Sequence, residues 1–190
     1  VPGDCVYVDL NADGEINSND ATRDIGYTDM PEYTAGLNTG FSWKNFDFSM
    51  QWTGAWNVDR MLDEFRRPLG DTNEKGLLLY QYDTTWRSSA DTFTAKFPRT
   101  SSLHASNNYA GSDLYLINAS YLRLKSVEIG YNFNFPFMKK LKMDNCRLYV
   151  NGYNLITITG FKWGDPESRQ SSRPNYPLTR VFNIGLKLGF

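Results

Sequence analysis

The feature that most constrains the fold of this chain is a strict alternation of residue types over its last ten positions. Large apolar residues occupy every second place, and small or polar residues lie between them. Side chains of a strand point to opposite faces with a period of two, so this segment predicts a strand with one apolar and one polar face. The apolar residues are Phe182, Ile184, Leu186, Leu188 and Phe190.

Four earlier segments alternate in a similar way, so the chain is expected to be all-β with about five antiparallel strands. The first two form a hairpin over residues 33–54, with a tight turn at Lys44-Asn45. The next two occupy residues 120–156, and a phase slip near Lys125-Ser126 predicts a β-bulge there. The hairpin strands have about 10 residues each, the length that a tilted strand needs to cross a bilayer.

Short and long connections alternate along the chain. The turn at Lys44-Asn45 is short and residues 134–145 are moderate, whereas residues 55–119 and 157–177 are long. All long loops would therefore lie at one end of the strands, as in outer-membrane barrels with short periplasmic turns and long external loops. This pattern predicts part of a transmembrane β-barrel, with residues 1–32, 55–119 and 157–177 extracellular and a closing strand over 178–190.

A soluble β-sandwich is the alternative fold, since its strands also alternate. Large aromatic residues at the strand ends weigh against it, because barrels carry aromatic girdles at the membrane interfaces. These residues are Trp43, Trp52 and Phe190. Five strands are too few to close a barrel, whose smallest common size is about eight strands, so we expect the chain to be a fragment of a longer protein.

Composition excludes several functional classes. The net charge of -1 gives no basic field for nucleic acid. The mean hydropathy is -0.51, which a barrel tolerates because only alternate residues face lipid. With one histidine, His104, and two distant cysteines, Cys5 and Cys146, neither a zinc site nor a catalytic constellation is expected. The chain is therefore not expected to be an enzyme.

Residues 9–20 have the spacing of an EF-hand calcium loop, D-x-N-x-D-G-x-I-x-x-x-D. Calcium takes about six to eight oxygen ligands, which this spacing delivers to one centre, and Gly14 permits the sharp turn. Asn17 is a further candidate, directly or through water. The alternative is an Asp/Asn-rich turn without a metal. The predicted ligands of a structural Ca²⁺ are Asp9, Asn11, Asp13, Glu15 through its carbonyl, and Asp20 in place of the usual Glu.

Several ordered segments together resemble the SusC-like TonB-dependent transporters of Bacteroidota. Residues 2–14 are similar to that family's P-G-D-x-x-Y-x-D-x-N-x-D-G stretch, with Ala12 where Gly is usual. Trp86 followed by residues 97–99 resembles its W…YPR region, and residues 120–131 resemble its S-Y-L-R-L-K-N…G-Y strand. Residues 154–167 and 176–190 resemble its N-L…T…DPE stretch and its YP…R…F end, with Leu178-Thr179 where Pro or Gln is common.

The resemblance implies a bacterial outer-membrane barrel of 22 strands with an N-terminal plug, of which this chain would supply the C-terminal five. It also implies a SusD-like surface lipoprotein as partner, energy from TonB through the plug, and an oligosaccharide or peptide as cargo. The expected function is import of glycans or other oligomeric nutrients. A soluble calcium-dependent carbohydrate-binding or adhesion module is the alternative.

Candidate cargo-binding residues are aromatic side chains of the long loop, of which Trp56, Tyr82 and Trp86 are the first choices. Packing of the loop on itself is the competing role for them. Asp165-Pro166-Glu167 is expected to form a structural turn. The strand pattern places a set of polar residues on the lumen face, where they would meet cargo or plug: Asp47, Gln51, Glu128, Asn132, Asn183 and Lys187.

Overall fold

The structure is a computed structural model that describes residues 1–63, 66, 78–100, 106–136, 142–168 and 178–190. The described part is mainly β, with one short α-helix and four 3₁₀ helices. The strands are β1 (Tyr33–Trp43), β2 (Phe46–Trp56), β3 (Asp59–Met61), β4 (Leu116–Asn118), β5 (Tyr121–Phe133), β6 (Asn145–Thr159) and β7 (Val181–Gly189). The helices are α1 (Leu79–Thr84) and the 3₁₀ turns Ser18–Asp20, Ser89–Asp91, Ser106–Tyr109 and Asp113–Tyr115.

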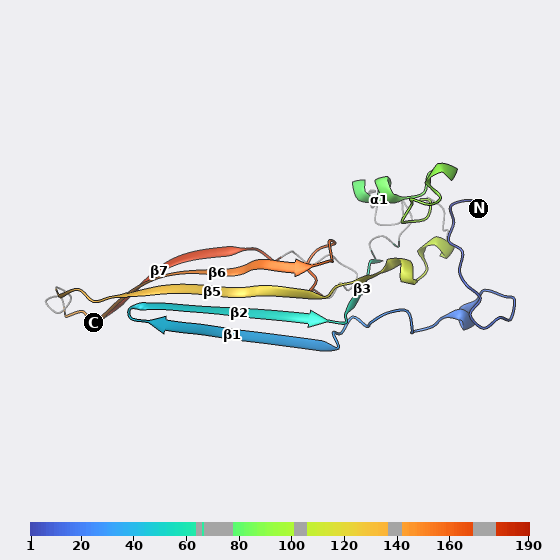
Figure 1. Cartoon of the computed structure of the whole chain (residues 1–190). Coiled ribbons are helices and arrows are strands. Elements are labelled where there is room, and N and C mark those ends of the chain that lie inside the picture. The colour runs from blue at the N-terminus through green and yellow to red at the C-terminus, as the bar shows by residue number, and fades with distance from the viewer. Residues whose placement is uncertain (64–65, 67–77, 101–105, 137–141, 169–177) are drawn as a thin grey trace. The chain divides into compact units, whose positions relative to one another are not determined.

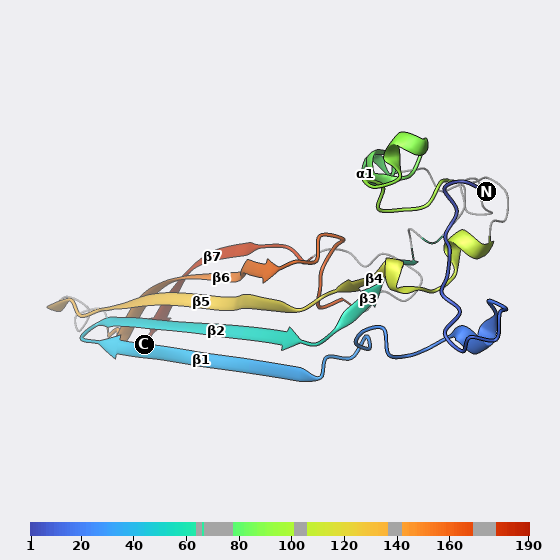
Figure 2. The same ribbon diagram turned by 45° about the vertical axis from the view of Figure 1, so that its right-hand side comes forward.

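The chain divides into two units, which are described separately. Unit 1 comprises Val1–Tyr27 and Asp59–Ile117, and unit 2 comprises Thr28–Val58 and Asn118–Phe190. Unit 2 is built on a five-stranded sheet of order β1-β2-β5-β6-β7, with every neighbouring pair antiparallel. Figures 1 and 2 show these strands side by side in that order. The expected all-β fold with about five antiparallel strands is confirmed.

Local sequence explains two features of this sheet. Lys44 has a left-handed φ of 54°, a conformation that two-residue hairpin turns require, and it joins Trp43 to its partner Phe46. The register of β5 shifts between Leu124 and Ser126, and opposite it the β2 register shifts between Gln51 and Trp52. This shift confirms the bulge predicted from the phase slip at Lys125-Ser126.

The two faces of the sheet differ in chemistry. Cross-strand partners share a face, so the register places Phe48, Ile129, Val150 and Ile184 in one apolar row. This apolar face is open: Phe182, Ile184 and Leu186 of β7 are exposed by 71, 77 and 59 %. Among the described residues of unit 2 no second sheet covers them, and a β-sandwich would bury this face, so its exposure weighs against that alternative.

No helix among the described residues combines the length and the apolar character needed to cross a membrane.

Unit 1 holds most of what the sequence pattern treats as two long loops. Its core includes Leu62 and Tyr115, whose side chains are 2 % and 1 % exposed. The backbone N–H of Leu62 donates to the carbonyl of Tyr115 at 2.8 Å, which extends the ladder of the small β3–β4 sheet. The described residues within 55–119 therefore include strands and helical turns, and β2 continues into this range as far as Trp56. The extracellular side assigned to residues 1–32, 55–119 and 157–177 stays a prediction.

Candidate functional sites

The Pro-Gly-Asp segment and the Trp…Phe-Pro-Arg region, far apart in sequence, meet in unit 1. Gly3 has a φ of 86° and packs so closely on the Trp86 ring that a methyl group at Gly3 would overlap it. The Arg99 backbone N–H donates to the Gly3 carbonyl at 2.8 Å. Gly3 is required both by its backbone conformation and by the ring beside it. We call Gly3, Asp4, Trp86, Arg99 and Asn108 the motif cluster.

Asp4 is the polar centre of the motif cluster. Its Oδ1 accepts the Arg99 Nε–H at 2.6 Å and the Asn108 amide at 2.7 Å. The Asn108 Oδ1 in turn accepts the backbone N–H of Cys5 at 2.8 Å, and Asn108 is fully buried. The bond from Arg99, followed by the bond from Asn108, lowers the pKa of Asp4. The carboxylate is therefore charged at neutral pH and fixes the start of the chain to residues about 100 positions later.

Tyr115 extends the motif cluster inward. Its hydroxyl donates to the Asn108 carbonyl at 2.6 Å, and its ring stacks on Phe97 with the centroids 5.9 Å apart. Burial raises the pKa of the Tyr115 phenol. Ionisation of Tyr115 is thus disfavoured, and its proton stays in the hydrogen bond to Asn108.

The three aromatic residues chosen from sequence do not form one site. Trp86 packs on Gly3 in the motif cluster. Tyr82 lies in α1, is 51 % exposed and has the Arg87 guanidinium 5.0 Å from its ring centre. Trp56 ends β2 in the other unit and lies against Gly54. Trp86 and Trp56 have packing contacts, and Tyr82 is half exposed with Arg87 over its ring. Cargo binding by all three stays a prediction.

The predicted calcium loop is closed by its own side chains. Asp9 Oδ2 accepts the Gly14 N–H at 2.8 Å, and Gly14 has a φ of 86°. Asp20 accepts the backbone N–H groups of Leu10 and Asn17, each at 2.8 Å. The bond from Asn17 lowers the pKa of Asp20 most, and the bond from Leu10 lowers it further. The loop therefore has the turn at its sixth position and the closing acid at its twelfth that a calcium loop needs.

The oxygen atoms of this loop are only partly used by hydrogen bonds. Asp9 Oδ1 is buried and has no hydrogen-bond partner among the described residues. Asp13 accepts the Asn11 amide at 2.9 Å and the Glu15 N–H at 2.8 Å. In the described part of the chain, no three Asp, Glu, His or Cys side chains converge as a metal cluster. The observation in favour of Ca²⁺ is the unpartnered Asp9 oxygen, and calcium binding stays a prediction.

The polar face of the sheet carries a connected network. Arg147 on β6 forms ion pairs with Asp47 on β2 and with Glu128 on β5, the latter at 2.8 Å. The Asn151 amide donates to Glu128 at 3.2 Å, and the Asn183 amide donates to Asn151 at 2.9 Å. Four of the residues predicted for the lumen face belong to one network, namely Asp47, Glu128, Asn132 and Asn183. Asn132 joins this network by donating to Asp47 at 3.4 Å, and the other two predicted residues, Gln51 and Lys187, lie on the same face.

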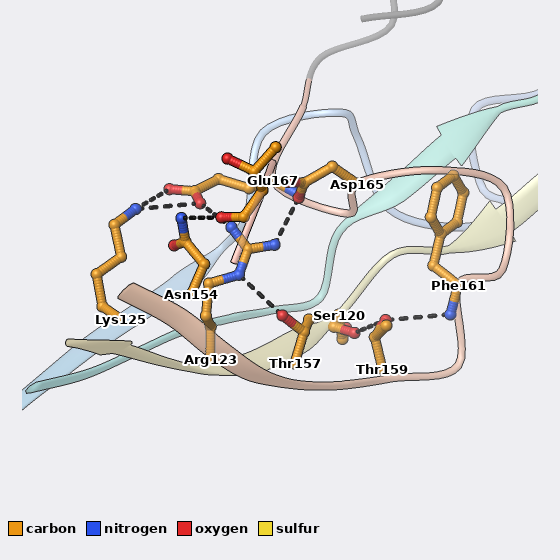
Figure 3. Close-up of polar contacts among 10 residues, drawn as sticks. Ser120, Arg123, Lys125, Asn154, Thr157, Thr159, Phe161, Asp165 and Glu167 are labelled. Carbon is orange, nitrogen blue, oxygen red and sulfur yellow. Dashed lines mark hydrogen bonds and ion pairs between the residues drawn. The ribbon is translucent and has the colours of Figure 1, made fainter. Parts of the chain in front are cut away.

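A second cluster lies where β5 and β6 reach the long connection (Figure 3). Arg123 donates to Asp165 and to Glu167, each at 2.6 Å, and its Nε–H donates to the Thr157 hydroxyl at 3.0 Å. The side chains of Arg123 and Asp165 are only 3 % and 7 % exposed. Lys125 contacts Glu167 at 3.3 Å near the surface. We call Arg123, Lys125, Asp165 and Glu167 the arginine clamp, because it ties the connection to the sheet.

Sequence reasoning found the turn at Asp165-Pro166-Glu167 and missed its partner. Asp165 Oδ1 accepts the Glu167 N–H at 2.9 Å, so the expected turn is present. Arg123 was not predicted from the sequence as a site residue, although it lies on the same polar face of β5 as Tyr121. A lone arginine on that face, with no acid opposite it in the strand pattern, is the signal that could have pointed to an acidic loop partner.

Comparisons with known proteins extend these observations. The TonB-dependent receptor P3 of Formosa agariphila is 30 % identical over 206 residues, covering 100 % of this chain and 19 % of the relative. The TonB-dependent receptor SusC of Bacteroides thetaiotaomicron is 28 % identical, covering 100 % of this chain and 18 % of the relative. The chain thus spans about a fifth of the length of these curated relatives. No protein-family model matches it.

Solved structures of other proteins share the fold of this chain. A structure of the RagAB peptide transporter superposes with a TM-score of 0.71 at 21 % identity, covering 93 % of this chain and 19 % of that one. The RagAB peptide importer in its open-open state gives a TM-score of 0.67 at 22 % identity, covering 86 % and 18 %. The relatives named here are receptors and importers rather than enzymes. The sheet is open and its apolar face is exposed, and the similarity to TonB-dependent receptor P3 and to SusC extends along the whole of this chain. Together these findings identify the chain as a fragment of a SusC-like TonB-dependent transporter, an outer-membrane β-barrel protein.

Proposed function

We propose that the whole protein is an energy-coupled importer that takes oligomeric nutrients across the outer membrane. The observation that carries this proposal is the sheet with one open apolar face for lipid and one polar, ion-paired face for a lumen. A SusD-like lipoprotein on the outer surface is proposed as partner, and TonB is proposed to supply energy through a plug. The similarity to SusC supports both partners.

Oligosaccharides are the first cargo class that we propose. Unit 1 offers exposed aromatic faces suited to stacking on sugars: Phe93 is exposed by 98 % and Tyr82 by 51 %. Short peptides are a second candidate, which the names of the RagAB structures favour.

Growth of the organism that encodes the protein provides the test. Deletion of the gene should abolish growth on one oligosaccharide or peptide mixture while growth on its monomers persists, because porins admit small solutes without energy. Loss of TonB should have the same effect, and the lipoprotein should co-purify with the tagged transporter in detergent. Unchanged growth of the deletion strain on every oligomer tried would contradict the importer proposal.

The loop over residues 9–20 is proposed to hold a structural Ca²⁺. Asp9, Asn11, Asp13 and Asp20 would supply side-chain oxygens, and Glu15 its carbonyl. The buried Asp9 Oδ1 has no hydrogen-bond partner among the described residues, which supports a bound cation. A buried carboxylate oxygen is unfavourable without a hydrogen-bond donor or a cation beside it. The ion would staple the loop and would take no part in transport chemistry.

Calorimetry with the full transporter tests the calcium proposal. Ca²⁺ should bind with one more site in the native protein than in Asp13→Ala, and chelation should speed proteolysis within the loop. Asp24→Ala, an exposed acid four residues beyond the loop, is the matched control and should change neither result. Equal calcium binding by native and Asp13→Ala proteins, with unaltered proteolysis, would refute the proposal.

A further inference from the structure

A cavity of about 380 Å³ lies in unit 2, between the end of β6, the residues that follow it and the start of β7. Its volume falls within the range of about 300–1,000 Å³ that small-molecule sites occupy. The lining residues that matter here are Arg123, Asn154, Lys162, Asp165, Leu178 and Arg180. Arg123 and Asp165 belong to the arginine clamp (Figure 3), which therefore forms one fixed wall of the cavity.

The charge on the cavity wall is unbalanced. Among the described residues that line the cavity, Asp165 is the one acid, and Arg123 already binds that carboxylate at 2.6 Å. Lys162 and Arg180 have no ion-pair partner among the described residues. The only acids between residues 160 and 180 are Asp165 and Glu167, and both are engaged by Arg123. Two cations are thus left to face an anion.

Asn154 contributes a hydrogen-bond acceptor to the cavity, in addition to the two cations. It holds a left-handed φ of 54° within β6, and its amide donates to the Thr179 carbonyl at 3.3 Å. Its Oδ1 is buried and has no partner among the described residues. A buried acceptor without a donor is unfavourable, so this position fits a ligand that carries an N–H or O–H group. The cavity therefore presents two cations and one acceptor.

We propose that this cavity is a subsite for the carboxylate end of a short peptide, an inference that rests on the proposed import of oligomeric nutrients. Lys162 and Arg180 bind the terminal carboxylate, and Asn154 Oδ1 accepts the N–H of the last peptide bond. Leu178 and Pro166 contact the last side chain. A sugar fits less well, because no aromatic ring stands among the described residues of the wall.

The test uses the full-length transporter in detergent and two probes, acetyl-tetra-alanine with a free carboxylate and the same peptide with a C-terminal amide. The amide should bind at least about tenfold more weakly, because it loses charge-assisted hydrogen bonds to both cations. Lys162→Gln and Arg180→Gln should each reduce this ratio, and the double variant should abolish it. Lys142→Gln, which removes an exposed lysine before the start of β6, at the opposite end of that strand from the cavity, should leave the ratio unchanged.

Several results would overturn the subsite: equal binding of the two peptides, no binding of either, or a ratio that survives in the double variant. A galacturonate trisaccharide that binds, while tetra-alanine does not compete with it, would overturn the peptide assignment as well. Growth of the gene-deletion strain distinguishes a failure of the subsite from a failure of the importer proposal. If gene deletion abolishes growth on an oligomer but the peptide ratio is absent, the subsite fails alone; if deletion has no effect, the importer proposal fails.

Discussion

Asp165 makes contacts in two directions. Its carboxylate accepts the Glu167 N–H within the turn and also holds the Arg123 guanidinium that reaches it from β5. The side chains of Asp165 and Arg123 are nearly excluded from water, so each charge is stabilised by the other in place of water. Lys125 and Glu167 form a similar pair at 3.3 Å, but these side chains are more than a third exposed. The buried ion pair is therefore expected to contribute more to the stability of the protein than the exposed one.

Asp165→Asn should destabilise the transporter by about 3–5 kcal/mol, because it removes the buried carboxylate beside the buried Arg123 charge and leaves only the more exposed Glu167 to pair with it. Lys125→Met, which breaks the exposed pair, should cost about 0–1 kcal/mol. Urea unfolding of the two variants in lipid vesicles measures both values. Equal costs for the two substitutions would show that the buried pair contributes no more than the exposed one.

Gly3 and Gly14 allow backbone strain and packing to be separated. Both have a φ of 86°, but a methyl group would overlap Trp86 at Gly3 and would meet nothing within 4 Å at Gly14. Gly3→Ala should therefore cost about 1–3 kcal/mol more than Gly14→Ala, the amount typical of overpacking. Local unfolding of the loops, followed by hydrogen exchange without calcium, gives the comparison. Equal protection losses would mean that Trp86 moves aside freely.

At the level of the elements, the strand pattern was informative because each strand has two different environments. In β7, Phe182, Ile184 and Leu186 lie on one face and Asn183 on the other, as alternation predicts. The bulge in β5 was also predictable, because one extra residue inverts the parity of all later positions. The ends of the strands were less predictable: β6 continues to Thr159, past the left-handed Asn154.

Ile184→Arg should destabilise the inserted barrel by about 2–4 kcal/mol, because it places a charge on the lipid face near the middle of β7. Asn183→Arg, one position away, should cost much less, since its side chain faces the polar network around Asn151. Refolding of the full protein into phosphatidylcholine vesicles over a urea series measures the difference. A larger cost at Asn183 than at Ile184 would mean that the two faces have been assigned the wrong way round.

At the level of the whole molecule, the sites were far less predictable than the sheet. Asp4 meets Arg99 and Asn108 about 100 residues away, and Arg123 meets Asp165 across 42 positions. No periodicity encodes such contacts, because they depend on how loops fold back on themselves. The motifs P-G-D, F-P-R and D-P-E were visible in the sequence, but the structure was needed to show that Asp4 pairs with Arg99 and Asp165 with Arg123.

The central claim is that the five-stranded sheet is a barrel wall with lipid on its apolar face and water on its polar face. Spin labels placed singly at residues 182–187, in the full transporter with Cys5 and Cys146 replaced by Ala and reconstituted in vesicles, test this most directly. Collisions with oxygen, which partitions into lipid, should peak at positions 182, 184 and 186, and collisions with a water-soluble nickel complex should peak at 183, 185 and 187. Uniform accessibility along the segment, or an alternation of the opposite phase, would contradict the account.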